Sequence, residues 1–426
     1  MTSPSTLPLR STSPRPAERY RAVTRASIHR TPQWESLSPG LREATKVVSS
    51  VLPFRTNAYV MEELIDWSAV PDDPIFQLTF VQKEMLEPEH YARIAHLLEV
   101  GAPKAEIERA AHSIREQLTP HPSGQTTLNV PELEGRRLPG MQHKYRETVL
   151  FFPSSGQTCH AYGTFCFRWP QFVGEKEQRF QAKETRDLVA YLAAHPEVSD
   201  LLVTGGDPMV ASVSQLRRYL DPILDDPSLG HLSTVRIGTK SVAYWPHRYV
   251  SDADADDLLR LFEKIVASGR HLALMAHYNH PRELGTAVAR EAIRRIRDTG
   301  AEVRMQSPLV RHVNDSAEAW AELWREGVNL GCIPYYMFVE RDTGPKRYFE
   351  VPLERAWEIF REAYQSVSGL GRTVRGPSMS ALPGKVLVDG IAEIRGEKVF
   401  VLQFLQARNP EWVRRPFFAR YDPKAT

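Results

Sequence analysis

Two of the chain's three cysteines, Cys159 and Cys166, lie on one short segment, TCHAYGTFCFRWPQF (158–172). A compact iron-sulfur cluster needs thiolates close together on a loop, because neighbouring side chains must reach its irons. The spacing allows such a cluster, and a pair of structural cysteines is the alternative. The third cysteine, Cys332, stands far along the chain. An odd and sparse set of cysteines argues against a disulfide framework and indicates a reducing compartment.

Two further turns carry residues that could do chemistry. In TGGDPM (204–209), Gly205 and Gly206 would let backbone groups approach a ligand closely, and Asp207 could pair with an ammonium. An ordinary turn is the alternative. In SALPGKVLVDG (380–390), Lys385 follows a Pro-Gly pair, where a lysine is most often simply solvated.

The elements that must position these residues alternate regularly. Short apolar runs separated by amphipathic helical stretches predict six parallel strands joined by right-handed crossovers, an α/β fold. The runs cover residues 148–152, 201–206, 235–241, 271–278, 302–310 and 332–339. In barrels of this kind the chemistry lies at the carboxyl ends of the strands. The cysteine pair and the Gly-Gly-Asp turn both fall there, whereas Cys332 begins the sixth strand and is expected near the opposite end.

The rest of the chain divides into regions by composition. Residues 41–137 repeat apolar side chains at three- and four-residue intervals, which predicts a helical N-terminal region. Residues 1–40 begin with a stretch rich in Ser, Pro and Arg and are expected to form a disordered or extended tail, so that removing residues 1–20 would leave folding unchanged. The partial barrel is expected over 138–345, with a C-terminal extension over 346–426.

The charge of the chain is nearly balanced. The 54 Lys and Arg residues against 52 Asp and Glu give a net charge of +2, too little for the basic surface that nucleic acids or anionic membranes usually require. No run of about 18 apolar residues and no N-terminal apolar stretch of a signal peptide occur. We therefore expect a cytoplasmic protein that acts on small or protein-bound substrates.

In their order, these segments resemble the lysine 2,3-aminomutases, a family of radical S-adenosylmethionine proteins. The loop resembles the signature Cys-x3-Cys-x2-Cys: Cys159 matches the first cysteine and Cys166 the third, whereas Gly163 stands where the second belongs. The resemblance covers roughly residues 138–385 and includes VRIGTKSVAYWPHR (235–248), HYNHP (277–281), MQSPLVRHVND (305–315) and IPYYMF (333–338). It implies a partial (β/α)6 barrel.

The resemblance also implies a cluster and its cofactor. In the family three thiolates hold a 4Fe-4S cluster and leave one iron open for S-adenosylmethionine, so Cys159 and Cys166 are the expected metal ligands. Gly205, Gly206, Asp207 and Gln306 are the expected cofactor contacts. Because glycine offers no ligand, the alternatives for the third position are His160, an external ligand, or a cluster lost through a natural or engineered cysteine-to-glycine exchange.

A second set of residues matches the family's amino-acid site. Lys385 aligns with the lysine that carries pyridoxal phosphate, and Lys144 and Tyr145 with residues that seat its phosphate. Arg168 aligns with the arginine that binds the substrate carboxylate, a surface ion pair being the alternative. Asp315 aligns with an aspartate that reads the distal amine of lysine, helix capping being the alternative.

The implied activity is a 2,3-aminomutase reaction, in which an amino group moves from Cα to Cβ of an amino acid. Its partners would be a small amino-acid substrate and an electron donor such as flavodoxin or ferredoxin, and a homo-oligomer is compatible with the sequence. Ser378 stands where a second lysine-binding aspartate is expected, which argues against lysine as substrate. The alternatives are a catalytically silent barrel and an enzyme that acts on a protein-bound lysine.

Overall fold

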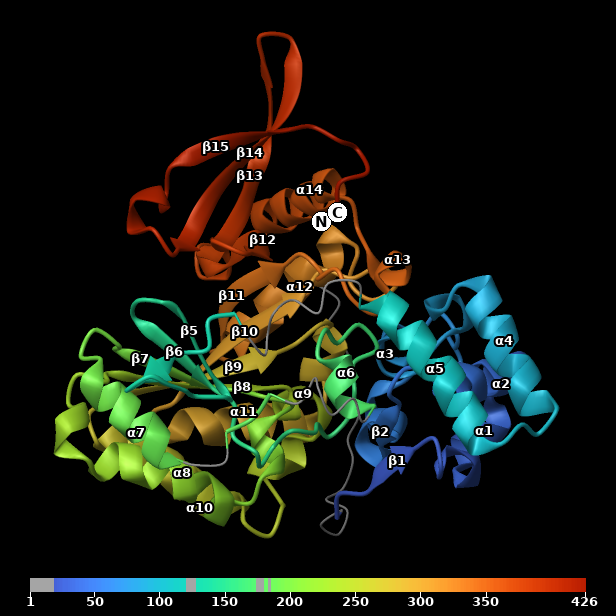
Figure 1. The fold of residues 1–426 in the computed structure, drawn as a ribbon, viewed down its shortest axis with the longest axis horizontal. Helices are drawn as coiled ribbons and strands as arrows, with labels where there is room; N and C mark the ends of the chain where they lie inside the picture. The colour runs from blue at the N-terminus through green and yellow to red at the C-terminus, as the bar shows by residue number, and fades with distance from the viewer. Residues whose placement is uncertain (1–18, 120–127, 174–179, 183–184) are drawn as a thin grey trace, which may run out of the picture.

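One large mixed sheet organises the molecule. The computed structural model describes residues 19–119, 128–173, 180–182 and 185–426. Within these ranges, eleven strands follow the order β15-β14-β13-β12-β11-β10-β9-β8-β7-β6-β5 (Figure 1). Strands β6 to β12 run parallel to one another. At one edge β5 pairs antiparallel with β6, and at the other edge β13, β14 and β15 each pair antiparallel with the strand before them.

The six predicted strands are confirmed nearly residue by residue. They are β6 (Thr148–Phe151), β7 (Asp200–Val203), β8 (Thr234–Thr239), β9 (His271–His277), β10 (Glu302–Pro308) and β11 (Ile333–Phe338). The connecting helices are α6 (Trp169–Phe172), α7 (Thr185–Ala194), α8 (Val213–Asp225), α9 (Ser241–Tyr244), α10 (Ala255–Ala267), α11 (Ala287–Asp298), α12 (Ala317–Asn329), α13 (Lys346–Phe349) and α14 (Leu353–Gln365). Apolar β-branched runs between amphipathic helices account for this agreement.

The two faces of the parallel sheet differ in burial. Along β10, Val303, Met305 and Ser307 are buried, whereas Arg304 and Gln306, which alternate with them, keep partial exposure. We call the face that carries the partly exposed residues the inner face. Strand register sets His277, Gln306, Tyr336 and Arg375 side by side across β9, β10, β11 and β12. The inner face is therefore where polar side chains of different strands meet.

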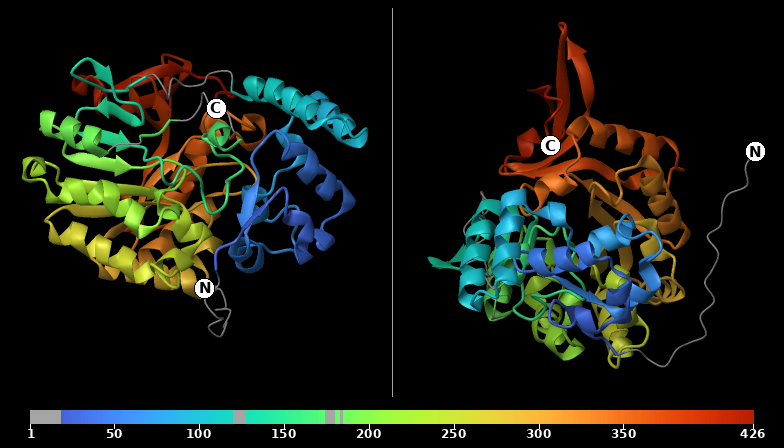
Figure 2. Two further views of the ribbon diagram at one scale, coloured as in Figure 1. Left: turned by 60° about the horizontal axis from the view of Figure 1, so that its bottom comes forward. Right: turned by 90° about the vertical axis from the view of Figure 1, so that its right-hand side faces the viewer.

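The C-terminal region extends the same sheet. Strands β12 (Arg375–Ala381), β13 (Gly384–Ile394), β14 (Glu397–Ala407) and β15 (Pro416–Arg420) continue it beyond β11. The β13–β14 hairpin projects from the body of the molecule (Figures 1 and 2). A small apolar cluster that includes Val386, Val388 and Phe400 packs these strands against Leu353 of α14. The start of β13, which carries Lys385, is thereby fixed to the parallel sheet.

The N-terminal region is helical, as expected, and its helices form one group beside the sheet (Figure 2). Its helices are α1 (Pro32–Ser36), α2 (Pro39–Val48), α3 (Pro74–Thr79), α4 (Pro88–Glu99) and α5 (Lys104–Leu118). Short strands β1 (Ala22–Thr24) and β2 (Arg55–Asn57) pair with each other, as do β3 (Glu132–Leu133) and β4 (Arg136–Arg137); β5 (Met141–Tyr145) joins the main sheet.

The expected tail over residues 1–40 is corrected from residue 19 onward, and residues 1–18 lie outside the described part. Trp34 and Leu37 are buried, and the Tyr20 hydroxyl donates to the His160 carbonyl oxygen at 2.8 Å. The Tyr20 ring also packs edge-on against His160 at 5.1 Å and Trp245 at 5.2 Å. This contact was not predicted from the sequence because the segment has few apolar residues. A few large side chains are nevertheless enough to attach it to the core. Removing residues 1–20 would therefore delete a contact to the cysteine loop.

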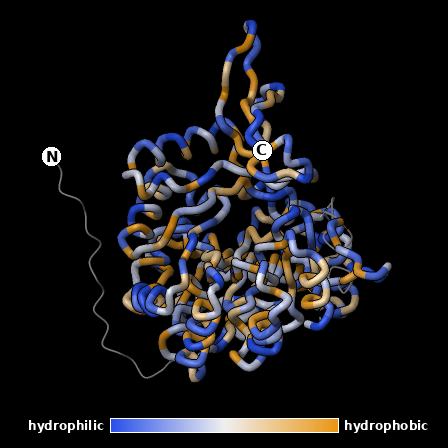
Figure 3. The backbone as a smooth tube through the Cα atoms, turned by 90° about the vertical axis from the view of Figure 1, so that its left-hand side faces the viewer, coloured by the Kyte–Doolittle hydropathy of each residue, from blue (hydrophilic) through white to orange (hydrophobic). Residues whose placement is uncertain are grey.

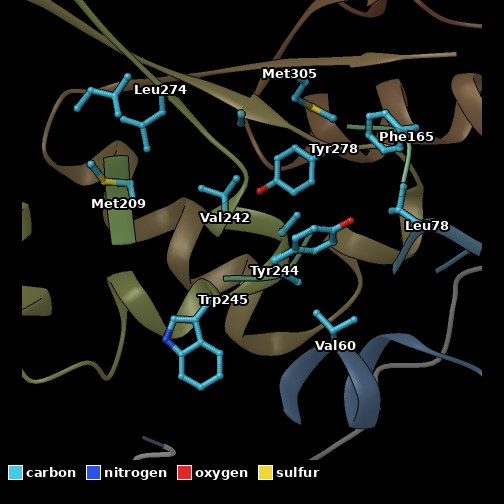
Figure 4. Packing of buried hydrophobic residues seen from close by; sticks show 14 of the residues in the cluster. Val60, Leu78, Phe165, Met209, Val242, Tyr244, Trp245, Leu274, Tyr278 and Met305 are labelled. Carbon is cyan, nitrogen blue, oxygen red and sulfur yellow. The ribbon is translucent and has the colours of Figure 1, made fainter. Parts of the chain in front are cut away.

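The core runs continuously from the N-terminal helices through the sheet. Hydrophobic stretches follow the interior segments, whereas hydrophilic stretches predominate along the outer turns, and the projecting hairpin carries both (Figure 3). Figure 4 shows Tyr244 and Tyr278 packed among aliphatic side chains, with Phe165 of the cysteine loop near Leu78 and Met305. Across the described ranges, the helices are too short or too polar to cross a membrane.

Candidate functional site

The cysteine loop follows β6 and is anchored by its own aromatic residues. Phe165 is buried, with its ring 5.7 Å from that of His277, and the hydroxyl of Thr164 donates to the carbonyl oxygen of Gln77 at 2.8 Å. Cys159 and Cys166 keep partial exposure on this anchored loop. Burial raises the pKa of both thiols, and the negative charge of Asp207 raises that of Cys159 further. The two thiols and Asp207 are thus neighbours, as the sequence predicted.

The glycine turn after β7 holds the cysteine loop by close backbone contact. The Asp207 amide donates to the carbonyl oxygens of Gly156 at 2.9 Å and Thr158 at 2.8 Å. A Cβ atom on Gly206 would stand 2.7 Å from the backbone of Gln157 and Thr158. The close approach of the loop therefore requires glycine at position 206. Thr158, one of the two residues in contact, directly precedes Cys159.

The Asp207 carboxylate has a structural role that the sequence did not predict. Its Oδ1 accepts from the Thr239 hydroxyl at 2.7 Å and the Met209 amide at 2.9 Å, and its Oδ2 accepts from the Lys240 amide at 2.9 Å. Burial raises its pKa to about 6, against the opposing effect of these hydrogen bonds. The carboxylate is 1% exposed and ties β7 to β8, so the structure does not present it to a ligand ammonium.

His160 is packed away rather than offered as a ligand. Its ring stacks on Trp245 at 6.5 Å, and burial, with the charges of Arg248 and Arg55, lowers its pKa to about 3. Its Nδ1 has no hydrogen-bond partner among the residues that the structure describes. Within the described ranges, the His, Cys, Asp and Glu side chains form no group of three suited to a metal ion.

A buried ion pair supports the ends of β8 and β9. The Lys240 ammonium donates to Glu283 at 2.8 Å, to the Asn279 side chain at 2.9 Å and to the His277 carbonyl oxygen at 3.2 Å. The Glu283 carboxylate also accepts from the His280 amide at 3.0 Å. This pair was not predicted from the sequence, because its members are 43 residues apart.

Lys385 lies at the beginning of β13 and reaches the inner face. Its ammonium is 4.0 Å from the centre of the Tyr336 ring and 5.4 Å from that of Phe338. Burial and the charges of Arg375, Arg236, Lys144 and Arg341 lower its pKa to about 7. Lys385 is thus held in cationic, poorly solvated surroundings, unlike a simply solvated turn lysine.

Lys144 and Tyr145, on the opposite edge strand β5, approach the same place. The Lys144 ammonium donates to the carbonyl oxygens of Ala381 at 2.6 Å and Gly384 at 3.3 Å, and burial lowers its pKa to about 8. Burial raises the pKa of Tyr145 to about 12. The structure thus brings both residues to the Lys385 turn, with Lys144 supporting that turn directly.

Arg168 is held by aromatic rings instead of a surface ion pair. Its guanidinium lies 4.5 Å from the centre of the Phe152 ring and 5.4 Å from that of Phe167. Burial lowers its pKa to about 10, and its buried Nη1 has no hydrogen-bond partner within the described part of the chain. Arg341, which the sequence did not single out, lies 4.4 Å from the Phe167 ring.

Two residues stand apart from this group. Asp315 is exposed, and Ser316 rather than Asp315 caps α12, by accepting from the Ala319 amide at 3.2 Å. Ser378 is fully buried, and its hydroxyl lies 3.5 Å from the carbonyl oxygen of Met337. No contact in the described structure brings Asp315 to Arg168 or Lys385. Gln306, the remaining expected cofactor contact, lies between His277 and Tyr336 on the inner face.

Comparisons with known proteins point to one family. A protein of Aquifex aeolicus named "Putative L-lysine 2,3-aminomutase" is 30% identical over 371 residues, which cover 87% of this chain and 85% of that protein. The L-lysine 2,3-aminomutase of Escherichia coli is 29% identical over 251 residues, covering 58% of this chain and 69% of the relative. No model of a protein family matches the chain. The chain belongs to the lysine 2,3-aminomutase family.

Solved structures show a more distant similarity. A radical SAM methyltransferase from Sphaerobacter thermophilus matches with a TM-score of 0.38 and 14% identity, over 67% of this chain and 92% of that one. Streptococcus suis SuiB, in complex with its precursor peptide SuiA, matches with a TM-score of 0.35 and 13% identity, over 63% of this chain and 57% of that one.

Proposed function

We propose that the protein binds pyridoxal phosphate at Lys385 and an α-amino acid at Arg168, as an amino acid 2,3-aminomutase on a partial (β/α)6 barrel would. The observation that carries the proposal is the state of Lys385. About half of an amine with a pKa of about 7 is neutral at pH 7, compared with under a thousandth of an ordinary lysine, and a neutral lysine amine is the nucleophile that attacks an aldehyde. Membership of the aminomutase family supports the same assignment.

The residues around Lys385 fit this cofactor. Lys144 and Tyr145 approach its turn from β5, and the Lys144 ammonium can offer a third donor to a phosphate while it holds the turn. The Tyr336 ring lies against the Lys385 ammonium and can pack against a pyridine ring. When bound, pyridoxal phosphate supplies the π-system over which an amino acid's nitrogen can move between Cα and Cβ.

Arg168 supports the amino-acid part of the proposal. Its guanidinium is a fork that matches a carboxylate, and its Nη1 has no partner in the described protein. Phe152 and Phe167 hold the guanidinium in place, so binding a carboxylate there would not require ordering a mobile side chain.

The cluster loop fits less well. Two thiols and Gly163 do not make the three-thiolate site that the signature describes, and His160, the nearest alternative ligand, is packed against Trp245. A protein that binds pyridoxal phosphate and an amino acid without radical chemistry is therefore the second candidate function, and Gly163 is the observation that favours it. S-adenosylmethionine, if bound, would lie at Gly205 and Gly206 beside this loop.

The test of the proposal is spectroscopic and does not require the cluster. Protein freed of cofactor is titrated with pyridoxal phosphate, and the absorbance band of the covalently attached cofactor is followed. We expect the band in the wild-type protein and in Lys424→Ala, which removes an exposed lysine, and its loss in Lys385→Ala. A band of equal strength in Lys385→Ala would contradict the proposal.

A further inference from the structure

The inner face around Lys385 carries an excess of positive charge. Of the four cationic side chains that lower its pKa, Arg236 is paired with a carboxylate, Asp200, at 2.8 Å. Arg375 lies over the rings of Tyr335 and Tyr336, and Lys144 donates to carbonyl oxygens. Anionic ligands would therefore be attracted to this face.

Two guanidinium groups stand out because they share one aromatic ring. Arg341 lies 4.4 Å and Arg168 5.4 Å from the centre of the Phe167 ring. In the described protein neither side chain has a carboxylate partner, and the charge of Arg341 contributes to the lowered pKa of Arg168. Two like charges without counterions repel each other, and a carboxylate bound at each guanidinium would offset that cost.

Arg341 is accessible to solvent and close to the lysines of the site. The residue is exposed, and its charge contributes to the lowered pKa values of Lys144 and Lys385. The adjacent residue, Glu340, faces a separate small cavity that Glu350 and Lys346 also line. The other adjacent carboxylate, that of Asp342, lies 3.6 Å from the Lys346 ammonium. Both neighbouring carboxylates are thus directed elsewhere, and the Arg341 guanidinium remains reachable by a ligand.

The residues expected to bind a distal ammonium do not offer a carboxylate to this site. Asp315 is exposed and outside the group around Arg168, and Ser378 is neutral and buried. A substrate with a positively charged side chain would meet Arg341 without a compensating anion.

We infer that the amino acid bound at this site carries a second carboxylate, with Arg168 binding one carboxylate and Arg341 the other. The inference rests on the proposed function, because pyridoxal phosphate at Lys385 places the amino group of the substrate. It names dicarboxylic amino acids as the substrate class, in contrast to lysine. Arg341 is then the residue that sets specificity.

The experiment measures binding of matched amino acids to protein loaded with pyridoxal phosphate, in phosphate-free buffer. Binding is followed by the absorbance change when an amino acid displaces Lys385 from the cofactor. Aspartate, glutamate and 2-aminoadipate are compared with asparagine, glutamine and lysine. We expect at least one dicarboxylic amino acid to bind about tenfold or more tightly than both its uncharged amide and lysine.

Variants locate the effect. Arg341→Gln should abolish the preference for the acid over its amide, and Arg341→Lys should keep part of it. Arg347→Gln is the matched control, because Arg347 lies six residues further along and pairs with Glu87 on the surface. It should leave the preference unchanged.

The outcomes separate this inference from the proposed function. If the cofactor attaches to Lys385 but lysine or an amide binds more tightly than every dicarboxylic amino acid, the inference is wrong and the proposed function stands. If Arg341→Gln weakens pyridoxal phosphate binding and leaves the preference intact, Arg341 binds the phosphate and the inference is also wrong. If no cofactor attaches to Lys385, the proposed function fails, and calorimetric titration of the cofactor-free protein with the same amino acids decides the inference alone.

Discussion

The Lys144 ammonium donates a hydrogen bond to the carbonyl oxygen of Ala381 at 2.6 Å. Lys144 belongs to the edge strand β5, whereas Ala381 ends β12, and six strands separate the two in the sheet. The sheet must therefore curve until its first strand reaches the β12–β13 turn. The position of Lys385, four residues beyond Ala381, depends on this contact between distant parts of the sheet.

Close backbone packing at Gly206 should make that position intolerant of a side chain. In Gly206→Ala, the new Cβ would overlap the backbone of Gln157 and Thr158, and neither can yield without moving the cysteine loop. We expect a loss of about 1–3 kcal/mol in the free energy of unfolding, measured by urea denaturation. Gly40→Ala is the control, since nothing lies within 4 Å of a Cβ there. Equal stability of the two variants would contradict this account of the loop.

The sequence predicted the parallel strands well because the residue pattern of each strand lies within its own short segment. Apolar β-branched runs, amphipathic helices between them and polar residues at strand ends placed β6 to β11 and the neighbourhood of Cys159, Cys166 and Asp207. The contact of Tyr20 with His160 and the position of Arg341 over the Phe167 ring were missed. Each depends on the pairing of residues far apart in the chain, and neither residue stands in a pattern that distinguishes it from an ordinary loop residue.

The hydrogen-bond partners of the site residues were the part of the site that the sequence predicted least well. The sequence predicted Asp207 beside the cysteines, but not that Thr239 and Lys240 would occupy its carboxylate. It predicted Asp315 near the substrate from a motif, whereas the structure leaves that side chain exposed. A residue's type and its position along a strand predict where it lies in the fold. The groups that contact its side chain come from other strands, so they cannot be predicted from the residue's own segment.

Gly163 leads to a prediction about iron. Two thiolates leave two irons of a 4Fe-4S cluster without protein ligands, so the protein should retain little iron after anaerobic reconstitution. Gly163→Cys should raise the content toward about four irons per chain. The backbone at 163 is outside the left-handed region, and a Cβ there would stand 3.1 Å from the tip of the Phe165 ring, which can shift slightly.

Gly163→Ala is the control for this experiment, because it adds the Cβ without a thiolate and should stay low in iron. Iron and sulfide per chain are measured for the three proteins side by side. About four irons in the Gly163 protein would show that another ligand completes the site, contrary to this account.

The lowered pKa of Lys385 predicts the pH dependence of cofactor attachment. The neutral amine is the reactive form, so with a pKa of about 7 the attachment rate should rise through neutral pH and level off above about pH 8. An ordinary lysine amine would keep gaining reactivity up to about pH 10. Arg375→Met removes the largest of the charge effects and should move the midpoint upward. A rate that still climbs in proportion to hydroxide at about pH 9 would contradict the assignment.

The most direct measurement identifies the lysine that carries the cofactor. The protein is loaded with pyridoxal phosphate, reduced with borohydride so that the attachment becomes permanent, digested, and mapped by mass spectrometry. We predict the label on Lys385, because cationic and poorly solvated surroundings lower the pKa of its amine to about 7 and so favour the reactive neutral form. Lys144, whose pKa is lowered less and whose ammonium is engaged with Ala381 and Gly384, should remain unlabelled. Label on Lys144 or another lysine, or no label with the cofactor present, would contradict the central claim.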